Sequence, residues 1–181
     1  MKITLKAILF IALTILFTLL LGWIQQNSEV VPAWVILPQL APGLAAWLML
    51  GIFRDQKMIL AVPEVHQQWW KFAAALLIPL GLAGLQFLIY QQLHHSLDVP
   101  PLRGTGFLIL LSWMFVGAFA EELGWRGYLQ PLLAGTLNGL LTSLVVGALW
   151  GLWHFGNYQQ GSSYMIFFVL STMAYSTVIT W

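Results

Sequence analysis

Two adjacent glutamates and an arginine lie at the end of an apolar stretch of this sequence. Glu121 and Glu122 follow an apolar run that begins at Phe107, and Arg126 comes four residues after Glu122. An ionised carboxylate at the centre of a membrane helix costs about 2.5–3.5 kcal/mol on insertion scales. Each of the two carboxylates therefore needs either a partner or a chemical task.

Helical spacing assigns different roles to the two carboxylates. Glu122 and Arg126 are four residues apart, so they share a helix face and can form an ion pair. Glu121 is turned away from Glu122 by about 100° on the same helix and needs a different partner. We therefore expect Glu122 and Arg126 to form a structural ion pair, and Glu121 to face a polar cavity.

A second chemically active group is His154, the only histidine inside a predicted span. Gly147, Trp150 and Gly151 precede it at spacings of three and four residues, so all four lie on one side of a helix. The two glycines allow another helix to approach closely, which would present the imidazole at a helix–helix contact. A neutral imidazole near a carboxylate can activate a water molecule or bind a metal ion.

Each of these features also has a purely structural explanation. A single histidine in a membrane helix often forms only a packing hydrogen bond, and a Glu–Arg pair at this spacing is often structural. Their coincidence in a chain so poor in charge favours a functional site. A cluster of four tryptophans is better explained by packing than by ligand binding: Trp113, Trp125, Trp150 and Trp153. The remaining histidines lie in predicted loops, where solvation is expected: His66, His94 and His95.

The composition places these residues in a membrane protein. Of 181 residues, 60% are hydrophobic and only 7% are charged, whereas a soluble domain carries about 25% charged residues. The apolar residues form runs of about 20, which is the length of a membrane-spanning helix. The short alternating segments of a membrane β-barrel are not visible. We therefore predict an all-α fold, a polytopic transmembrane helical bundle of about six spans.

The predicted spans divide the chain into N-terminal transmembrane helices at 1–104 and a second half at 105–181, which contains Glu121, Glu122, Arg126 and His154. The spans are 3–24, 34–53, 69–90, 107–130, 139–158 and 162–181. Lys2 and Lys6 resemble the start of a signal peptide, but the apolar run of about eighteen residues is too long and no cleavage site follows. We expect a retained first helix.

Basic residues set the orientation of the spans, because cytoplasmic loops carry an excess of lysine and arginine. With the N-terminus inside, Arg103 is the only basic residue in an outside loop. The other basic residues near span ends then lie on the cytoplasmic side: Lys2, Lys6, Arg54, Lys57 and Lys71. The opposite topology would reverse this distribution.

Charge and cysteine content exclude several classes of function. A net charge of +1 with scattered basic residues leaves no patch for nucleic acid. The absence of cysteine excludes disulfides, thiolate zinc sites and a cysteine nucleophile. A proton-coupled transporter would use buried Glu and His, but paired broken helices in repeated halves are not visible.

The two motifs resemble those of a known family, the CPBP intramembrane proteases. This family includes the CAAX prenyl endopeptidases and the bacterial bacteriocin-processing or immunity (Abi) proteins. The first motif is Glu121, Glu122 and Arg126, followed by Gly127-Tyr128-Leu129. The second motif, usually Phe-x-x-x-His, reads Trp150-Gly151-Leu152-Trp153-His154 here. The resemblance covers 105–181, whereas the N-terminal spans match only in kind.

The family's third motif, a later helix with His-x-x-x-Asn or His-x-x-x-Asp, is absent. The sequence stops at Trp181, at the end of an apolar run without a polar tail. We expect a C-terminal truncation. The alternative is a degenerate member of the family that has lost the third motif.

The resemblance implies an intramembrane endopeptidase. Glu121 and His154 would position and deprotonate a water molecule, which attacks a peptide carbonyl of a membrane-associated peptide or prenylated protein. The missing histidine and asparagine would serve as metal ligands or as oxyanion donors. Both a zinc metalloprotease, with Glu121, Glu122 and His154 as candidate ligands, and a metal-free glutamic endopeptidase are compatible with these residues.

Membrane lipid is the expected surrounding of this chain, and a bacterial cytoplasmic membrane is its expected location, because the motif variant looks bacterial. The competing hypothesis is a non-catalytic immunity or scaffold protein that retains the motif for helix packing.

Straight helices would place Glu121 nearer the cytoplasmic side than His154 by about 10 Å. Residues 131–138, with Pro131 and two polar residues, are therefore expected to form a short interfacial or re-entrant piece.

Overall fold

The computed structural model describes residues 2–29, 31, 35–54 and 105–180, and between the last two ranges residues 77, 81, 84, 85, 88, 89, 91 and 92. The predicted span at 69–90 therefore lies almost entirely outside the described residues. So do several residues used in the sequence analysis: Lys57, His66, Lys71, His94, His95 and Arg103. The chain forms two compact units, Met1–Leu60 with Leu108–Trp181, and Ala61–Phe107. The first unit contains every candidate site residue.

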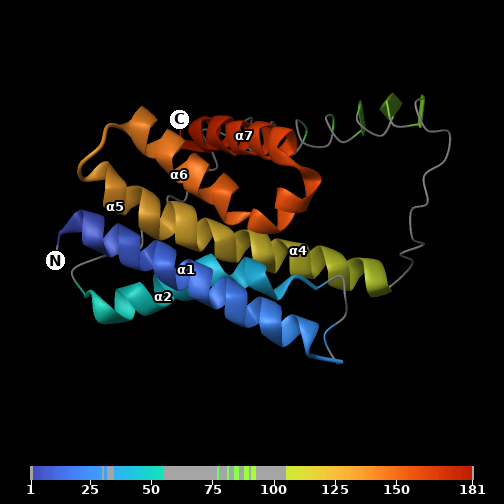
Figure 1. Ribbon diagram of the computed structural model, residues 1–181, viewed down its shortest axis with the longest axis horizontal. Helices are drawn as coiled ribbons and strands as arrows, with labels where there is room; N and C mark the ends of the chain where they lie inside the picture. The colour runs from blue at the N-terminus through green and yellow to red at the C-terminus, as the bar shows by residue number, and fades with distance from the viewer. Residues whose placement is uncertain are drawn as a thin grey trace, which may run out of the picture. The chain divides into compact units, whose positions relative to one another are not determined.

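Helices make up all the regular structure of the described residues, which confirms the predicted all-α fold (Figure 1). In chain order they are α1 Ile3–Gln26, η1 Leu37–Leu40, α2 Ala41–Ile52, α4 Thr105–Gly124, η2 Trp125–Leu129, α5 Gln130–Ala134, α6 Gly139–Trp153, η3 Phe155–Gln160 and α7 Ser162–Thr180. The predicted division at residue 104 stays a prediction.

Three helical segments of the described chain are long and apolar enough to cross a membrane: Ile3–Gln26, Leu108–Ala134 and Ser162–Thr180. They correspond to the predicted spans 3–24, 107–130 and 162–181. Two further apolar helices are shorter, Leu37–Ile52 and Gly139–Trp153. The described residues therefore indicate an integral membrane protein with three helices able to span a bilayer, and the count of six stays a prediction.

The predicted span 139–158 is too long, because α6 ends at Trp153. His154 leaves the helical conformation with φ −76° and ψ 44°, and a 3₁₀ helix follows it. At the other end, Asn138 caps the helix by accepting a hydrogen bond of 2.9 Å from the backbone N–H of Leu141. The histidine of the second motif therefore lies at a helix end rather than inside a helix.

The expected interfacial or re-entrant piece at 131–138 is corrected over 131–134, because α4, η2 and α5 form one continuous helix to Ala134, so the fourth helix ends later than the predicted 130. A π-helical turn, η2, comes directly before Pro131, and Gln130 N–H bonds the carbonyl of Trp125, five residues back. This wider turn accommodates the proline, which lacks an N–H and crowds the preceding turn of an α-helix. The chain turns only afterwards, where the N–H groups of Thr136 and Leu137 each bond the Leu133 carbonyl at 2.9 Å.

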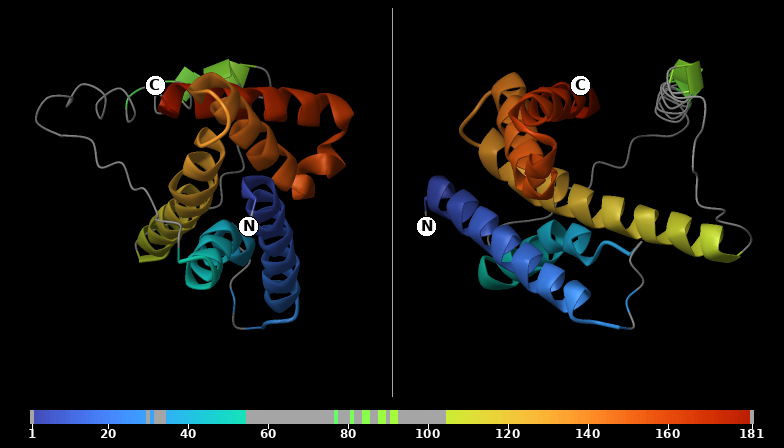
Figure 2. Two further views of the ribbon diagram at one scale, coloured as in Figure 1. Left: turned by 90° about the vertical axis from the view of Figure 1, so that its left-hand side faces the viewer. Right: turned by 45° about the vertical axis from the view of Figure 1, so that its right-hand side comes forward.

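The first unit packs around an apolar core between α1, α2, η2 and α6 (Figures 1 and 2). Phe10 of α1 is central, with its ring centroid 5.7 Å from that of Trp125 and 5.2 Å from that of Tyr128. Both of these aromatic residues belong to η2, so the π-helical turn is fixed by core packing. Helices α6 and α7 lie side by side in both figures.

Large apolar side chains also point outward from the long helices. Examples are Leu16 of α1, Phe115 of α4 and Phe167 of α7, all of them exposed. In water such surfaces would drive aggregation, whereas in a bilayer they contact lipid. The outward side chains therefore agree with the composition in assigning these helices to a membrane.

Candidate functional site

Small residues surround Glu121 on one face of α4 and bring α2 against it. A methyl group added at Gly124 would lie 2.6 Å from the backbone carbonyl carbon of Pro42. One added at Gly43 would lie 3.0 Å from the carbonyl oxygen of Ala120. Such distances leave no room for a side chain, so the first turn of α2 packs directly on the backbone of α4. Glu121 is buried at this contact, with 7% of its surface exposed.

The partner of Glu121 comes from another helix. The indole Nε1 of Trp150, in α6, donates a hydrogen bond of 2.8 Å to Oε2 of Glu121. The sequence indicated that Glu121 needs a partner other than Arg126, and Trp150 is that partner. A residue of the second motif therefore holds the carboxylate of the first motif.

The predicted ion pair between Glu122 and Arg126 is confirmed, with Arg126 Nη1 3.0 Å from Glu122 Oε1. The guanidinium of Arg126 also lies over the ring of Trp150, 4.4 Å from the ring centroid. Cation–π contacts of this kind are worth about 0.5–2 kcal/mol. Trp150 thus contacts two of the three charged residues of the first motif, Glu121 through its N–H and Arg126 through its ring face.

His154 contacts the same tryptophan through the backbone. Its Nδ1 lies 2.9 Å from the carbonyl oxygen of Trp150. Because a carbonyl can only accept a hydrogen bond, this contact requires the proton on Nδ1 and leaves the lone pair on Nε2. The rings of Trp153 and Phe168 enclose the imidazole edge-on, at centroid distances of 4.8 and 5.1 Å. These contacts therefore fix the orientation of the imidazole, and in its neutral form Nε2 would carry the lone pair.

The close helix approach predicted from Gly147 and Gly151 is confirmed. A methyl group added at Gly147 would lie 2.6 Å from the Cα atom of Met173, and one at Gly151 would lie 2.9 Å from Cα of Val169. Both neighbours belong to α7. This tight seam between α6 and α7 brings Phe168 against the imidazole.

Glu121 and His154 share Trp150 but form no hydrogen bond with each other in the described part of the chain. Trp150 and His154 are one helical turn apart, which is about 6 Å along the axis at 1.5 Å per residue. Trp150 therefore contacts both Glu121 and His154. The geometry groups Glu121, Arg126 and His154 around this indole, and Glu122 joins them through its ion pair with Arg126.

The candidate zinc ligands do not come together as a set. Among the described residues, no three His, Cys, Asp or Glu side chains are placed to hold a metal ion. A catalytic zinc ion usually takes three protein ligands and a water molecule. Glu121, Glu122 and His154 therefore do not fit a zinc site by themselves, and we derive no reaction step through a metal.

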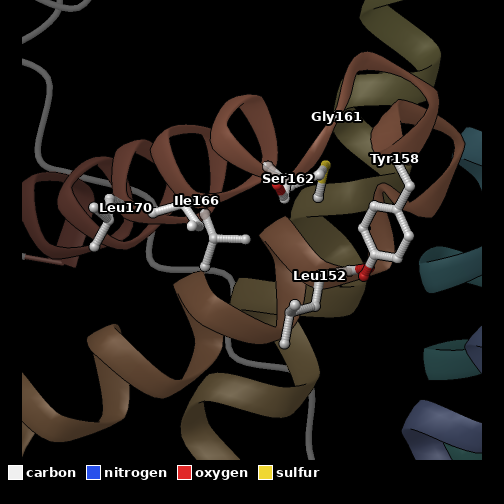
Figure 3. A pocket seen from close by; sticks show the side chains of 8 residues that line it. Leu152, Tyr158, Gly161, Ser162, Ile166 and Leu170 are labelled. Carbon is white, nitrogen blue, oxygen red and sulfur yellow. The ribbon is translucent and has the colours of Figure 1, made fainter.

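Two cavities lie near the end of α6. One, of about 580 Å³, is almost entirely apolar and is lined by residues such as Leu152, Ile166 and Leu170 (Figure 3). It contains none of the candidate site residues. The other, of about 560 Å³, lies between α1, η1 and the junction of α6 with η3, and its lining includes Gln39 and His154. The cavity beside the imidazole is thus the one with polar walls.

Sequence reasoning missed Gln39 and the pairing role of Trp150. Gln39 is the only polar side chain other than the indole of tryptophan in the predicted span 34–53. The argument applied to Glu121, that a polar residue in an apolar span needs a partner or a task, could have identified it. The N–H of Trp150 gave no such signal, because tryptophan is common in packed membrane interfaces.

The C-terminal part of the chain is similar to proteases of one family. Residues 103–181 match the family of type II CAAX prenyl endopeptidases called Rce1-like. A protein named CAAX prenyl protease 2 from Methanococcus maripaludis is 34% identical over 115 residues, which cover 58% of this chain and 40% of that protein.

A second group of relatives extends over more of the chain. Lysostaphin resistance protein A from Staphylococcus haemolyticus is 24% identical over 177 residues, which cover 94% of this chain and 48% of that protein. The protein of the same name from Staphylococcus aureus is 24% identical over 147 residues, which cover 77% and 34%. The chain thus spans half the length, or less, of these curated relatives.

Proposed function

We propose that this chain carries part of the active site of an intramembrane endopeptidase, because residues 103–181 match the Rce1-like type II CAAX prenyl endopeptidases. The resemblance seen in the two motifs is confirmed by this match and by the named relatives. The proposed substrate is a membrane-associated peptide or a prenylated protein. The proposed reaction is hydrolysis of a peptide bond by an activated water molecule.

One observation carries this proposal: Trp150 Nε1 donates a hydrogen bond of 2.8 Å to the buried carboxylate of Glu121. Trp150 itself lies one helical turn before His154. Burying an unpaired carboxylate in an apolar bundle is costly, and a protein has little reason to retain it for packing alone. A carboxylate and a histidine that contact the same tryptophan are the groups that general-base activation of a water molecule would use. The arrangement thus supports chemistry at this position.

In the proposed reaction Glu121 and His154 act on the water molecule and the ion pair supports them. Glu121 takes a proton from the water while the water oxygen attacks the scissile carbonyl. The C–N bond then breaks as the leaving amine receives that proton. Nε2 of His154 retains a lone pair, since Nδ1 is engaged with the Trp150 carbonyl at 2.9 Å. Glu122 neutralises Arg126 at 3.0 Å, and Arg126 in turn packs on the face of Trp150.

The described residues of this chain do not by themselves supply donors to the oxyanion or a set of ligands for a metal ion. Donors to the oxyanion are worth about 2.7–4 kcal/mol each in hydrolases, and the family's third motif would provide them. We propose a bacterial cytoplasmic membrane as the location, with the N-terminus inside.

The test is cleavage of a farnesylated CAAX peptide by the natural full-length protein in membranes. Glu121→Gln and His154→Gln should each lower the cleavage rate by about 10²–10⁴-fold, as expected for loss of a general base. The membrane level of both variants, measured by immunoblot, should stay unchanged. Cleavage by Glu121→Gln at the rate of the unmodified protein would contradict the proposal.

A second candidate is a non-catalytic immunity or scaffold protein. It is favoured by the relatives named lysostaphin resistance protein A, one of which matches 94% of this chain. In that case Glu121 and Trp150 would serve helix docking alone. The same two variants would then reduce the amount of protein in the membrane, and the unmodified protein would leave the peptide intact.

A further inference from the structure

The side chain of Gln39 lies on the face of α4 that carries Glu121. A methyl group added at Gly117 would overlap Oε1 of Gln39 and would lie 2.9 Å from its Cδ atom. Gly117 is one helical turn before Glu121, so the amide lies on the same side of α4 as the carboxylate. Glycine at this position is what allows the amide to reach the helix.

Hydrogen bonds donated by backbone N–H groups fix η1, the short helix that carries Gln39. The N–H of Leu37 donates to Oε1 of Gln25, near the end of α1, at 2.8 Å. The N–H of Gln39 donates to the Ile36 carbonyl at 3.2 Å. The amide is thus presented by a segment tied to α1, outside the region that matches the protease family.

The amide of Gln39 has unused hydrogen-bonding capacity. Its Oε1 is buried and has no hydrogen-bond partner within the described part of the chain. Most buried polar atoms in proteins are paired, so an unpaired one calls for an explanation. An amide offers two donors and an acceptor, which is the complement of a peptide group.

The same side chain lines the cavity of about 560 Å³ that His154 also lines. Thr18, another lining residue, already accepts from Trp153 Nε1 at 2.8 Å and donates to the Thr14 carbonyl at 2.7 Å. Gln39 is thus a polar residue of the cavity wall, as are Gln26 and His154, and its side chain lies against Gly117, one helical turn before Glu121.

We infer that Gln39 is a substrate-binding residue, whose side-chain amide hydrogen-bonds the backbone of a peptide in the cavity beside His154. This inference rests on the proposed function, because it takes the occupant to be the peptide substrate. Leu19 and Ile36 supply apolar walls for the side chains of the peptide. The volume falls in the range of small-ligand sites, about 300–1,000 Å³.

Peptide binding tests the inference without requiring catalysis. The natural full-length protein, carrying Glu121→Gln and reconstituted in nanodiscs, is titrated with a fluorescent farnesylated CAAX peptide. Adding Gln39→Met, which keeps the length of the side chain, should weaken binding about 5- to 10-fold, the effect of one lost hydrogen bond. Gln160→Met is the matched control, because Gln160 is exposed on η3 and lies outside the lining of this cavity. It should leave the affinity unchanged.

Cleavage by the protein with Glu121 intact separates the inference from the proposed function. Gln39→Met should raise KM and leave kcat nearly unchanged, as expected for a group that binds substrate and transition state equally. Intact cleavage with unchanged KM and affinity would overturn the role of Gln39 alone. Absence of cleavage in the unmodified protein would overturn the proposed function, whatever the binding result.

A crosslinking measurement covers the case in which Gln39→Met fails to fold. A photo-crosslinking residue in place of Leu19, which lines the cavity, should capture the farnesylated peptide. The same residue in place of Leu20, which is exposed on α1 but lies outside the lining, is the control. Capture of lipid alone at position 19, or equal capture of peptide at both positions, would overturn the inference.

Discussion

Trp150 Nε1 donates a hydrogen bond of 2.8 Å to Oε2 of Glu121, and this contact joins α6 to α4. The family to which the second motif is similar usually has phenylalanine at this position, which has no N–H to donate. The tryptophan of this chain thus adds a hydrogen bond between the two motifs. The two short motifs behave as one structural unit, although 29 residues separate the paired side chains.

Trp150→Phe removes the hydrogen-bond donor and keeps an aromatic ring. Under the proposed function, cleavage should fall by about 10- to 150-fold, because a hydrogen bond to a charged group is worth about 1.5–3 kcal/mol. The readout is the cleavage rate of the farnesylated peptide at equal protein level. Trp47→Phe is the control, since Trp47 is 72% exposed on α2. Equal loss in both variants would point to a general effect of losing tryptophan.

Glu122→Gln leaves the guanidinium of Arg126 without its charged partner at 3.0 Å. The buried guanidinium should then destabilise the protein by about 1–3 kcal/mol. Unfolding in increasing SDS, followed by circular dichroism, measures this loss. The double variant Glu122→Gln with Arg126→Gln should recover part of it, because no unpaired charge remains. A double variant less stable than the sum of the single effects would contradict a simple ion pair.

Gly147→Ala should disrupt the seam between α6 and α7. The added methyl group would lie 2.6 Å from Cα of Met173, a backbone atom that cannot move away by itself. Overpacking of this kind costs about 1–3 kcal/mol. Gly51→Ala in α2 is the matched control, because no atom lies within 4 Å of the added methyl group. Gly51→Ala should raise the free energy of unfolding by about 0.5–1 kcal/mol, because alanine favours the helical conformation more than glycine does. Thermal unfolding in detergent distinguishes the two.

A double-mutant cycle should show that Trp153 and Thr18 stabilise each other. Trp153 Nε1 donates to Thr18 Oγ1 at 2.8 Å between two buried side chains. Trp153→Phe and Thr18→Val should together cost less than the sum of their separate effects. The expected coupling is about 0.5–1.7 kcal/mol, the range for side-chain hydrogen bonds in membrane bundles. Strict additivity of the unfolding free energies would argue against this contact.

The absence of cysteine makes the orientation directly testable, because a single introduced cysteine is the only reactive thiol. Lys2→Cys and Asn27→Cys place a thiol at exposed positions at opposite ends of α1. With the N-terminus inside, a membrane-impermeant maleimide should label Asn27→Cys in intact cells. It should label Lys2→Cys only after permeabilisation. The reverse pattern would contradict the positive-inside assignment.

Local spacing was enough to predict some features of the site. The Glu122–Arg126 pair and the glycine contact of α6 follow from residues three or four positions apart, which the helical period places on one face. The membrane class and the all-α fold follow from composition and the length of the apolar runs. Each of these depends on interactions within one segment or on the solvent around it.

The local sequence pattern was not enough to predict where two of the helices end. The apolar pattern of 139–158 continues past Trp153, yet α6 ends there as His154 turns out of the helix. The proline at 131 suggests a break, yet a π-helical turn packed against Phe10 carries the helix onward to Ala134. Hydropathy does not distinguish these outcomes, because packing between distant segments decides them.

The sequence by itself determined that Glu121 requires a partner, since burial of a carboxylate in an apolar span has a cost that any fold must meet. Only the tertiary structure decided that the partner is Trp150 and that the amide of Gln39 lies one turn away, against Gly117. The reason is physical: a helix fixes the direction of its own side chains, but docking of α2 and α6 on α4 depends on the combined shape of their small and aromatic residues. That combined shape is a property of the folded bundle and of no single segment.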